Sequence, residues 1–307
     1  GGQAVIEGVM MRNGKQCAVA VRKPDGEIEV KKETVTSLRD RYAIARVPVI
    51  RGIVSFVESL SSGMKTLDYS ASFYEEEDYE PGKVEQFFTK IFGDKLESVL
   101  MGITMVISVI LALGIFMVLP FFLTNLMKGF LPSYSIRTLI EGIIRVALFL
   151  IYIWLISKME DIKRVFMYHG AEHKTINCLE HGEDLTPENI KKYSRLHKRC
   201  GTSFLLIVMI VSIVVFMFIR VDSLVWKFVL RILLVPVVAG ISYEFIRLAG
   251  RSDSKIVNTL SKPGLYLQYF TTREPDEEMM EVAIKAVEGV FDWREYLRAM
   301  HNGELED

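Results

Sequence analysis

Two long stretches without any charged residue dominate the pattern of polar and apolar positions along the chain. The first runs from Ser98 to Met127 and covers 30 residues, and the second runs from Cys200 to Ile219 and covers 20 residues. Because about 20 apolar residues cross the hydrocarbon core of a bilayer, each stretch predicts a transmembrane helix.

Two further apolar segments, 138–157 and 226–246, contain a few charges. In the first, Glu141 and Arg145 are four residues apart, so they share one side of a helix and can neutralise each other. In the second, the charges lie toward the ends, where long side chains reach the membrane surface: Lys227, Arg231 and Glu244.

The distribution of lysine and arginine decides whether two or four of these segments cross the membrane. Nine such residues lie between Lys158 and Arg199. Two spans alone would place this basic stretch outside, whereas four spans return it to the cytoplasm and leave three basic residues in the outer connections: Lys128, Arg137 and Arg220. Since cytoplasmic loops are enriched in positive charge, the pattern favours four spans with both termini in the cytoplasm.

The segments outside the spans predict a mixed α/β domain. Alternating residues at 16–22 and 27–32, with Pro24-Asp25-Gly26 between them, predict a β-hairpin. Residues 50–67 have apolar side chains at helical spacing. This helix either faces a protein core, or lies on the membrane surface or docked on the spans. A polar linker at 75–82 and a short amphipathic helix then lead into the first span.

The chain after the last span predicts another helix, opened by Glu274-Pro275-Asp276-Glu277-Glu278. Proline suits the start of a helix, and acidic side chains suit the positive end of its dipole. The helix carries an apolar stripe: Met279, Val282, Ala283, Ala286, Val287 and Val290. Both ends of the chain can therefore contribute to one cytoplasmic domain.

The predicted fold class is an α-helical integral membrane protein with four transmembrane helices and a mixed α/β cytoplasmic domain built from the N- and C-terminal segments. The expected regions are an N-terminal cytoplasmic region (1–97), a first transmembrane hairpin (98–157), a cytoplasmic helical connection (158–202), a second transmembrane hairpin (203–246) and a C-terminal cytoplasmic helical region (247–307).

Composition narrows the class of protein further. A net charge of −1 and a mean hydropathy of +0.26 exclude a basic nucleic-acid-binding protein and a disordered chain, and argue against an ordinary soluble enzyme. With only 3 cysteines, the chain is not a disulfide-scaffolded secreted domain and fits a reducing compartment.

The predicted cytoplasmic connection contains the pattern H-x-x-E-H at residues 169–173. On a helix, residues four apart point in nearly the same direction, so His169 and His173 can hold one divalent metal ion, which we expect to be zinc. Glu172 is then placed to act as a base toward a metal-bound water, in the order found in inverzincin metallopeptidases. The alternative is a hydrogen-bonded network of His, Glu and Lys side chains without a metal.

A catalytic zinc site needs a third protein ligand. His197 is the favoured residue, because three of the 5 histidines would then converge, and Cys200 is an additional candidate beside it. Cys178 would point away from the pair on a helix, and His181 is a weaker candidate because it directly precedes a predicted helix end at Gly182.

Four segments resemble motifs of the YqhQ-like family of bacterial membrane proteins: GGQAVIEGVMMR (1–12), YHGAEHKT (168–175), RCGTSF (199–204) and TTREP (271–275). The resemblance covers almost the whole chain. It implies a multi-pass protein of the bacterial plasma membrane, in a family often described as predicted metal-dependent enzymes. One difference is Lys198, where many relatives carry proline.

The resemblance also directs attention to two further carboxylates. Glu7 lies in the glycine-rich opening of the chain, where it either belongs to a plain turn or approaches the histidines. Glu244 lies at the cytoplasmic end of the fourth span, and an ionisable group in a span is a candidate for a functional site.

Three classes of function follow from these residues. The first is a membrane-embedded, metal-dependent hydrolase that faces the cytoplasm and acts on a membrane-associated substrate. The second is a non-catalytic scaffold or assembly factor that docks a partner protein through its cytoplasmic domain. The third is a transporter, which ranks last because no internal repeat relates the two halves. The expected partners are the lipid bilayer, the substrate or partner protein and a second copy of the chain in a homo-oligomer, but no nucleic acid.

The four-span topology predicts which side of the membrane each connection faces. A cysteine introduced by Glu183→Cys should react with a membrane-impermeant maleimide only after the cells are opened, because the basic connection is cytoplasmic. The matched variant Lys128→Cys should react in intact cells, and the unsubstituted chain gives the background of the native cysteines. Labelling of Glu183→Cys in intact cells would contradict the topology.

Overall fold

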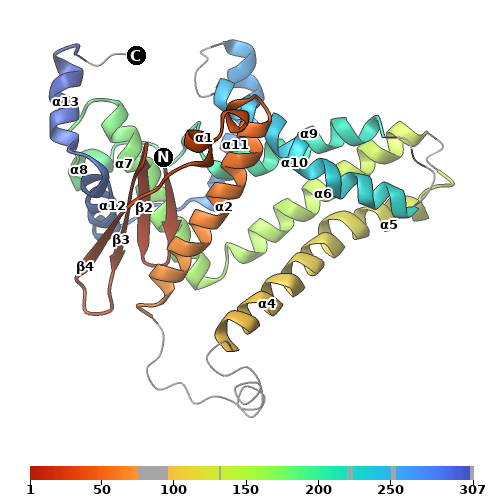
Figure 1. Cartoon of the computed structure of the whole chain (residues 1–307), viewed down its shortest axis with the longest axis horizontal. Coiled ribbons are helices and arrows are strands. Elements are labelled where there is room, and N and C mark those ends of the chain that lie inside the picture. Colours follow the sequence, from red (N-terminus) through yellow and green to blue (C-terminus); the bar gives the residue numbers. More distant parts are fainter. Residues whose placement is uncertain (75–95, 131–132, 220, 222–223, 250–253, 305–307) are drawn as a thin grey trace. The chain divides into compact units, whose positions relative to one another are not determined.

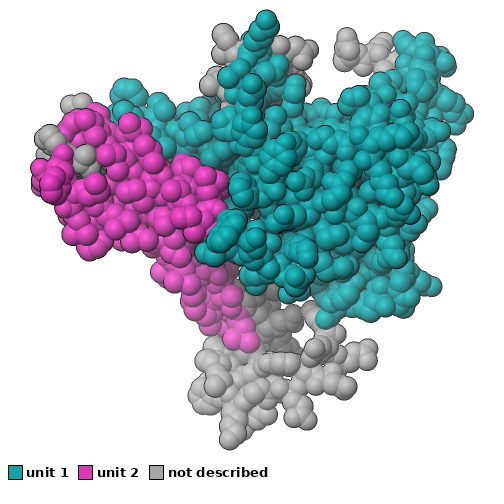
Figure 2. Space-filling view, turned by 180° about the vertical axis from the view of Figure 1, so that it is seen from behind, with its two compact units in different colours: residues 1–74, 152–307 teal, residues 75–151 magenta. Residues whose placement is uncertain are grey.

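The computed structural model describes residues 1–74, 96–130, 133–219, 221, 224–249 and 254–304. The chain forms two compact units, residues 1–74 with 152–307 and residues 75–151 (Figure 2). The linker expected at 75–82, the short helix expected before the first span, and Arg220 lie outside the described residues.

The larger unit contains a four-stranded antiparallel sheet in the order β1-β2-β3-β4 (Figure 1). Its strands are β1 (Gly2–Val5), β2 (Gly8–Asn13), β3 (Gln16–Arg22) and β4 (Ile28–Thr34). Strands β3 and β4 pair from Arg22 opposite Ile28 to Gln16 opposite Thr34, which confirms the predicted hairpin.

The two central strands of this sheet, β2 and β3, are buried on both faces. One face packs against α7 (Glu160–Glu180) and α12 (Glu277–Val290), and the whole predicted apolar stripe of α12 lies in that core. Tyr69 and Phe73, at and after the end of α2 (Ile50–Ala71), pack on the other face. The core therefore joins segments from both ends of the sequence, because an antiparallel sheet with two apolar faces needs a covering layer on each.

Helix α2 turns its small and polar residues toward the rest of the unit. Its buried residues are Gly52, Gly63, Thr66 and Ser70. Its large apolar side chains face outward, with Val57, Leu60 and Met64 at 55%, 53% and 48% exposed. The buried side of α2 packs against the apolar helix α10 (Leu224–Ala249), where Gly52 lies against Gly240. Because the large apolar side chains do not face a core in the described structure, the alternative of a helix docked on the spans or lying on the membrane surface is favoured.

Three helices are long and apolar enough to cross a membrane: Gly102–Leu126, Tyr134–Ile156 and Val225–Ala249. The first is built by α4 (Leu96–Leu113), η3 (Gly114–Val118) and α5 (Leu119–Leu126), the second by α6 (Tyr134–Ile156) and the third by α10 (Leu224–Ala249). Helix α9 (Gly201–Met217), which lies in the remaining predicted span, is apolar but has 17 residues, about 26 Å of helix. Helix composition therefore places the chain among multi-pass membrane proteins.

The charged residues inside the apolar helices have two kinds of surroundings. Within the smaller unit, Arg145 and Glu141 form a buried ion pair of 3.1 Å, which confirms their expected mutual neutralisation. Arg231 was expected to reach the membrane surface, and this expectation is wrong. Its side chain is 2% exposed and its guanidinium lies 5.2 Å from the ring centroid of Phe216, because α9 packs against this side of α10.

The other described helices are α1 (Leu38–Arg41), η1 (Ala43–Arg46), α8 (Pro187–Ile190), α11 (Lys255–Thr271) and α13 (Trp293–His301). Helix α11 packs against α9, and its buried Gln268 donates hydrogen bonds to the backbone carbonyl of His197 and to the hydroxyl of Ser203, each at 2.8 Å. These contacts fix the start of α9 relative to the segment that precedes it.

The outward apolar face of α2 predicts contact with lipid. A nitroxide attached at Leu60→Cys should collide mainly with molecular oxygen, which concentrates in the hydrocarbon phase, whereas the same label at Asp25→Cys in the β3–β4 turn should collide mainly with a water-soluble nickel chelate. Power-saturation EPR in proteoliposomes measures both. A Leu60 label as accessible to nickel as the Asp25 label would contradict the lipid contact.

Candidate metal centre

The H-x-x-E-H pattern lies in the middle of α7, where the helix is most buried. Every residue from Gly170 to Thr175 is buried there. His169 and His173 lie on the same side of the helix, as predicted, with their ring centroids 4.3 Å apart. The helix thus brings two imidazoles together inside the larger unit.

Each of the two imidazoles is oriented by a backbone carbonyl group. The Nδ1 atom of His169 lies 2.8 Å from the carbonyl oxygen of Thr271, and that of His173 lies 2.6 Å from the carbonyl oxygen of Arg195. Because a carbonyl oxygen only accepts hydrogen bonds, both Nδ1 atoms donate. In the neutral rings the lone pairs are then on Nε2, which is the arrangement found in metal-binding histidines.

Cys200 completes a group of three ligand atoms with these histidines. Its Sγ atom lies 3.3 Å from Nε2 of His169, and the ligand atoms of His169, His173 and Cys200 all lie within 4.8 Å of one another. Cys200 is also the N-cap of α9, where its sulfur accepts a hydrogen bond from the backbone amide of Thr202 at 3.4 Å. The thiol is therefore held in place by the start of an apolar helix.

Glu172 lies beside this group. One carboxylate oxygen is 3.9 Å from Nε2 of His169 and 3.7 Å from Nε2 of His173, and the residue is 4% exposed. Strand β1 passes so close that a Cβ atom at Gly2 would lie 2.8 Å from the Glu172 side chain. A buried carboxylate next to two Nε2 atoms is positioned to exchange protons with a molecule bound there.

His197, the favoured third ligand from the sequence, lies near the group but is oriented elsewhere. Its ring centroid is 5.8 Å from that of His173, while its Nε2 atom lies 3.3 Å from a carboxylate oxygen of Glu180. Burial lowers the pKa of His197, and the charge of Glu172 partly opposes this shift. Cys200, and not the His197 favoured from the sequence, therefore forms the group of three with the two histidines.

The two other carboxylates singled out in the sequence form ion pairs. Glu7 lies in the turn between β1 and β2 with φ +47°, pairs with Arg164 and accepts a hydrogen bond from the hydroxyl of Tyr168 at 3.2 Å. Burial and the nearby Glu7 charge raise the pKa of Tyr168. Glu244 pairs with Arg51 of α2. Glu7 therefore docks the sheet onto α7 just before the histidines, and Glu244 ties α10 to α2.

Gly170 allows the backbone carbonyl of Thr271 to lie next to His169. A Cβ atom at this position would lie 2.0 Å from the carbonyl oxygen of Arg273, whose amide donates to the carbonyl of Phe166 at 2.8 Å. Only glycine allows the segment 271–275 to lie directly on α7, and this contact places the Thr271 carbonyl at His169. A glycine in the middle of the H-x-x-E-H pattern is the signal in the sequence that could have indicated this contact.

The same arrangement brings together the four motifs quoted from the sequence. The motif at 1–12 contributes Gly2, and the motif at 168–175 contributes the two histidines. The motif at 199–204 contributes Cys200, and the motif at 271–275 contributes the carbonyl of Thr271. The carbonyl of Arg195 and the paired Glu180 could not be identified from the sequence, because they depend on the path of the loop after α8.

Comparison with known proteins agrees with the resemblance seen in these motifs. The family described as "Protein of unknown function (DUF1385)" matches residues 47–293. The chain is 37% identical over 287 residues to "Uncharacterized protein YqhQ" of Bacillus subtilis (strain 168), which covers 93% of this chain and 90% of that protein. None of the solved structures matches the chain.

The close approach at Gly170 predicts a large effect from a single methyl group. Gly170→Ala should lower the free energy of unfolding by roughly 3 kcal/mol, because the methyl group meets a backbone carbonyl that cannot rotate away. The midpoint of thermal unfolding in detergent measures the loss. Gly201→Ala is the matched control, since a Cβ atom at that helical glycine meets nothing within 4 Å. Equal midpoints for the two variants would contradict the proposed contact.

Proposed function

This chain belongs to the DUF1385 family, and we propose that it is a membrane-embedded, metal-dependent hydrolase. His169, His173 and Cys200 hold the metal, and Glu172 transfers the proton. The orientation of the imidazoles carries this proposal, because both Nδ1 atoms donate to backbone carbonyls and leave the Nε2 lone pairs for a metal, and the ligand atoms of His169, His173 and Cys200 lie within 4.8 Å of one another. A purely structural network has no need to gather two imidazole Nε2 atoms, a thiol and a carboxylate around one buried point.

The ligand types favour zinc. Two imidazole nitrogens and one sulfur suit zinc, whereas magnesium and calcium prefer oxygen ligands. Three protein ligands leave one position for water, and a zinc ion at such a site lowers the pKa of that water to about 7. The site therefore has the composition of a catalytic centre rather than that of a closed structural one.

The groups around the metal ligands have separate roles in the proposed reaction. Glu172 accepts the proton of the attacking water and returns it to the leaving group, as a buried carboxylate beside the reacting atoms can. The carbonyls of Thr271 and Arg195 keep both histidines in one tautomer and orientation. His197, with its Nε2 atom on Glu180, supports the wall of the site and is not a ligand in this proposal.

The position of Cys200 indicates a membrane-associated substrate. Cys200 caps α9, so one ligand stands at the very start of an apolar helix. In the proposed topology α9 is the third of four spans, both termini are cytoplasmic and the site faces the cytoplasm of a bacterial cell at the plasma membrane. A lipid, a lipid-linked precursor or a membrane-protein segment would then reach the site from the bilayer.

The second candidate function is an enzyme that uses the Cys200 thiol as its nucleophile, and one distance favours it. The Sγ atom of Cys200 lies 3.3 Å from Nε2 of His169, within reach for proton transfer from a thiol to an imidazole base. This chemistry needs no metal. A non-catalytic scaffold, in which the group only stabilises the fold, needs neither metal nor a reactive thiol.

Metal content separates these functions. The full chain, purified in mild detergent without chelators, should contain about one zinc ion per chain by inductively coupled plasma mass spectrometry. His169→Ala and Cys200→Ser should lose the ion, because each removes a ligand. Glu172→Gln and His197→Ala should retain it, and so should the control Cys178→Ser, which alters a buried thiol that contacts the carbonyls of Glu183 and Asp184 instead.

A chain that binds no zinc, even after dialysis against it, would overturn the metal proposal. Iodoacetamide would then distinguish the other two functions. A thiol nucleophile predicts alkylation of Cys200 that slows in His169→Ala, whereas a scaffold predicts no dependence on His169.

A further inference from the structure

A strongly basic cavity lies in the larger unit, and no histidine lines it. It has a volume of about 730 Å³ and is lined by six basic side chains: Arg12, Lys15, Arg39, Arg46, Arg51 and Arg247. The one acidic side chain in its lining is Asp40. None of these residues belongs to the group of His169, His173 and Cys200.

Two of the basic side chains are already matched by carboxylates. Arg51 pairs with Glu244, and Lys15 lies 3.8 Å from Asp40. The other four, the arginines at 12, 39, 46 and 247, form no ion pair with any residue of the described ranges. The cavity therefore holds a surplus of positive charge that the protein itself does not balance.

Neutral acceptors hold several of these arginines in place. Arg39 donates to the hydroxyl of Tyr243 at 3.3 Å, and Arg46 donates to the carbonyl of Arg39 at 2.8 Å. Arg12 donates to the carbonyl of Gly14 at 3.1 Å. Guanidinium groups ordered without a counter-charge have a geometry suited to the oxygens of a phosphate, which arginine binds in a bidentate manner.

The surroundings of the cavity indicate where that phosphate comes from. Tyr243 and Arg247 lie near the end of the apolar helix Val225–Ala249. The adjoining α1 and η1 expose large apolar side chains between their arginines: Leu38, Tyr42, Ile44 and Val47 are 45%, 57%, 67% and 47% exposed. A surface that combines apolar and basic side chains in this way suits the headgroup region of a bilayer.

We propose that this cavity binds the phosphate group of an anionic phospholipid at the membrane surface. The shared chemistry is a phosphate between arginine side chains. The apolar side chains around the cavity favour a ligand that has acyl chains over free inorganic phosphate, because a soluble ion gains nothing from them. The site is independent of the metal centre, so each proposal can fail without the other.

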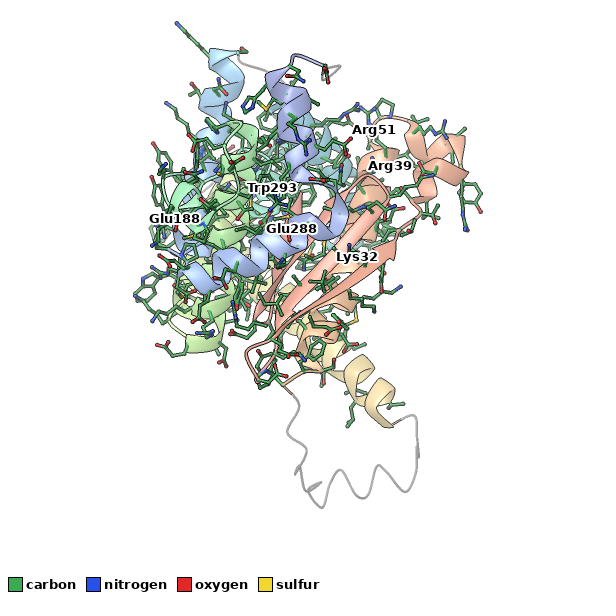
Figure 3. All side chains as sticks on the ribbon, turned by 90° about the vertical axis from the view of Figure 1, so that its left-hand side faces the viewer. Lys32, Arg39, Arg51, Glu188, Glu288 and Trp293 are labelled. Carbon is green, nitrogen blue, oxygen red and sulfur yellow. The ribbon has the colours of Figure 1, made fainter. Side chains whose placement is uncertain are left out.

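Native mass spectrometry of the full chain in detergent tests the proposal. The probes are palmitoyl-oleoyl phosphatidylglycerol and, as a neutral reference, palmitoyl-oleoyl phosphatidylcholine. The double variant R39Q/R46Q should bind phosphatidylglycerol roughly tenfold more weakly, because two charge-assisted contacts are lost. The control K32Q/R298Q removes two exposed charges elsewhere in the same unit and should bind like the parent. Figure 3 shows Lys32 on the sheet, apart from Arg39 and Arg51.

Radiolabelled inorganic phosphate, measured by equilibrium dialysis, provides the second arm. Saturable phosphate binding that depends on Arg39 and Arg46, without selective binding of phosphatidylglycerol, would overturn the lipid as the source. Equal phosphatidylglycerol binding by both double variants would overturn the site itself. R12Q/R247Q repeats the test with the two other unpaired arginines of the lining, and the thermal midpoint shows that each variant is folded.

Discussion

The candidate centre depends on one close backbone contact, the approach of the segment 271–275 to α7. Gly170 has no side chain at the point where the carbonyl of Arg273 meets the helix, so the two backbones can touch. The hydrogen bond from the amide of Arg273 to the carbonyl of Phe166 holds the contact, and the carbonyl of Thr271 then accepts a hydrogen bond from His169. A side chain would separate the backbones and leave an imidazole without its orienting partner.

The charges around α7 show how a buried polar group of this kind is tolerated. Lys174 is buried, and its ammonium group pairs with Glu274 on the segment that crosses the helix. Glu7 of the β1–β2 turn pairs with Arg164 of α7, and Glu180 pairs with both Arg199 and His197. A buried charge without a partner would destabilise the unit by several kcal/mol. These pairs leave Glu172 as the buried carboxylate that faces the histidines.

The sequence predicted local features well, and its limit lies at contacts between distant segments. Hydrophobic runs identified the long apolar helices, a turn signal identified the β3–β4 hairpin, and the spacing of His169 and His173 placed both rings on one side of a helix. Each of these depends on neighbours along the chain. The orientation of His197 and the proximity of Cys200 depend instead on the loop after α8 and on Gln268 of α11. The spacing of residues along the sequence does not predict such contacts.

The order of these parts along the chain also constrains biosynthesis. The two histidines leave the ribosome before Cys200 and well before Thr271, whose carbonyl orients the first ring. The nascent protein therefore cannot assemble its centre until the last apolar helix and α11 have been made. A chain interrupted after Cys200 but before that point would contain all three side chains of the group, yet His169 would lack the backbone carbonyl that orients its ring.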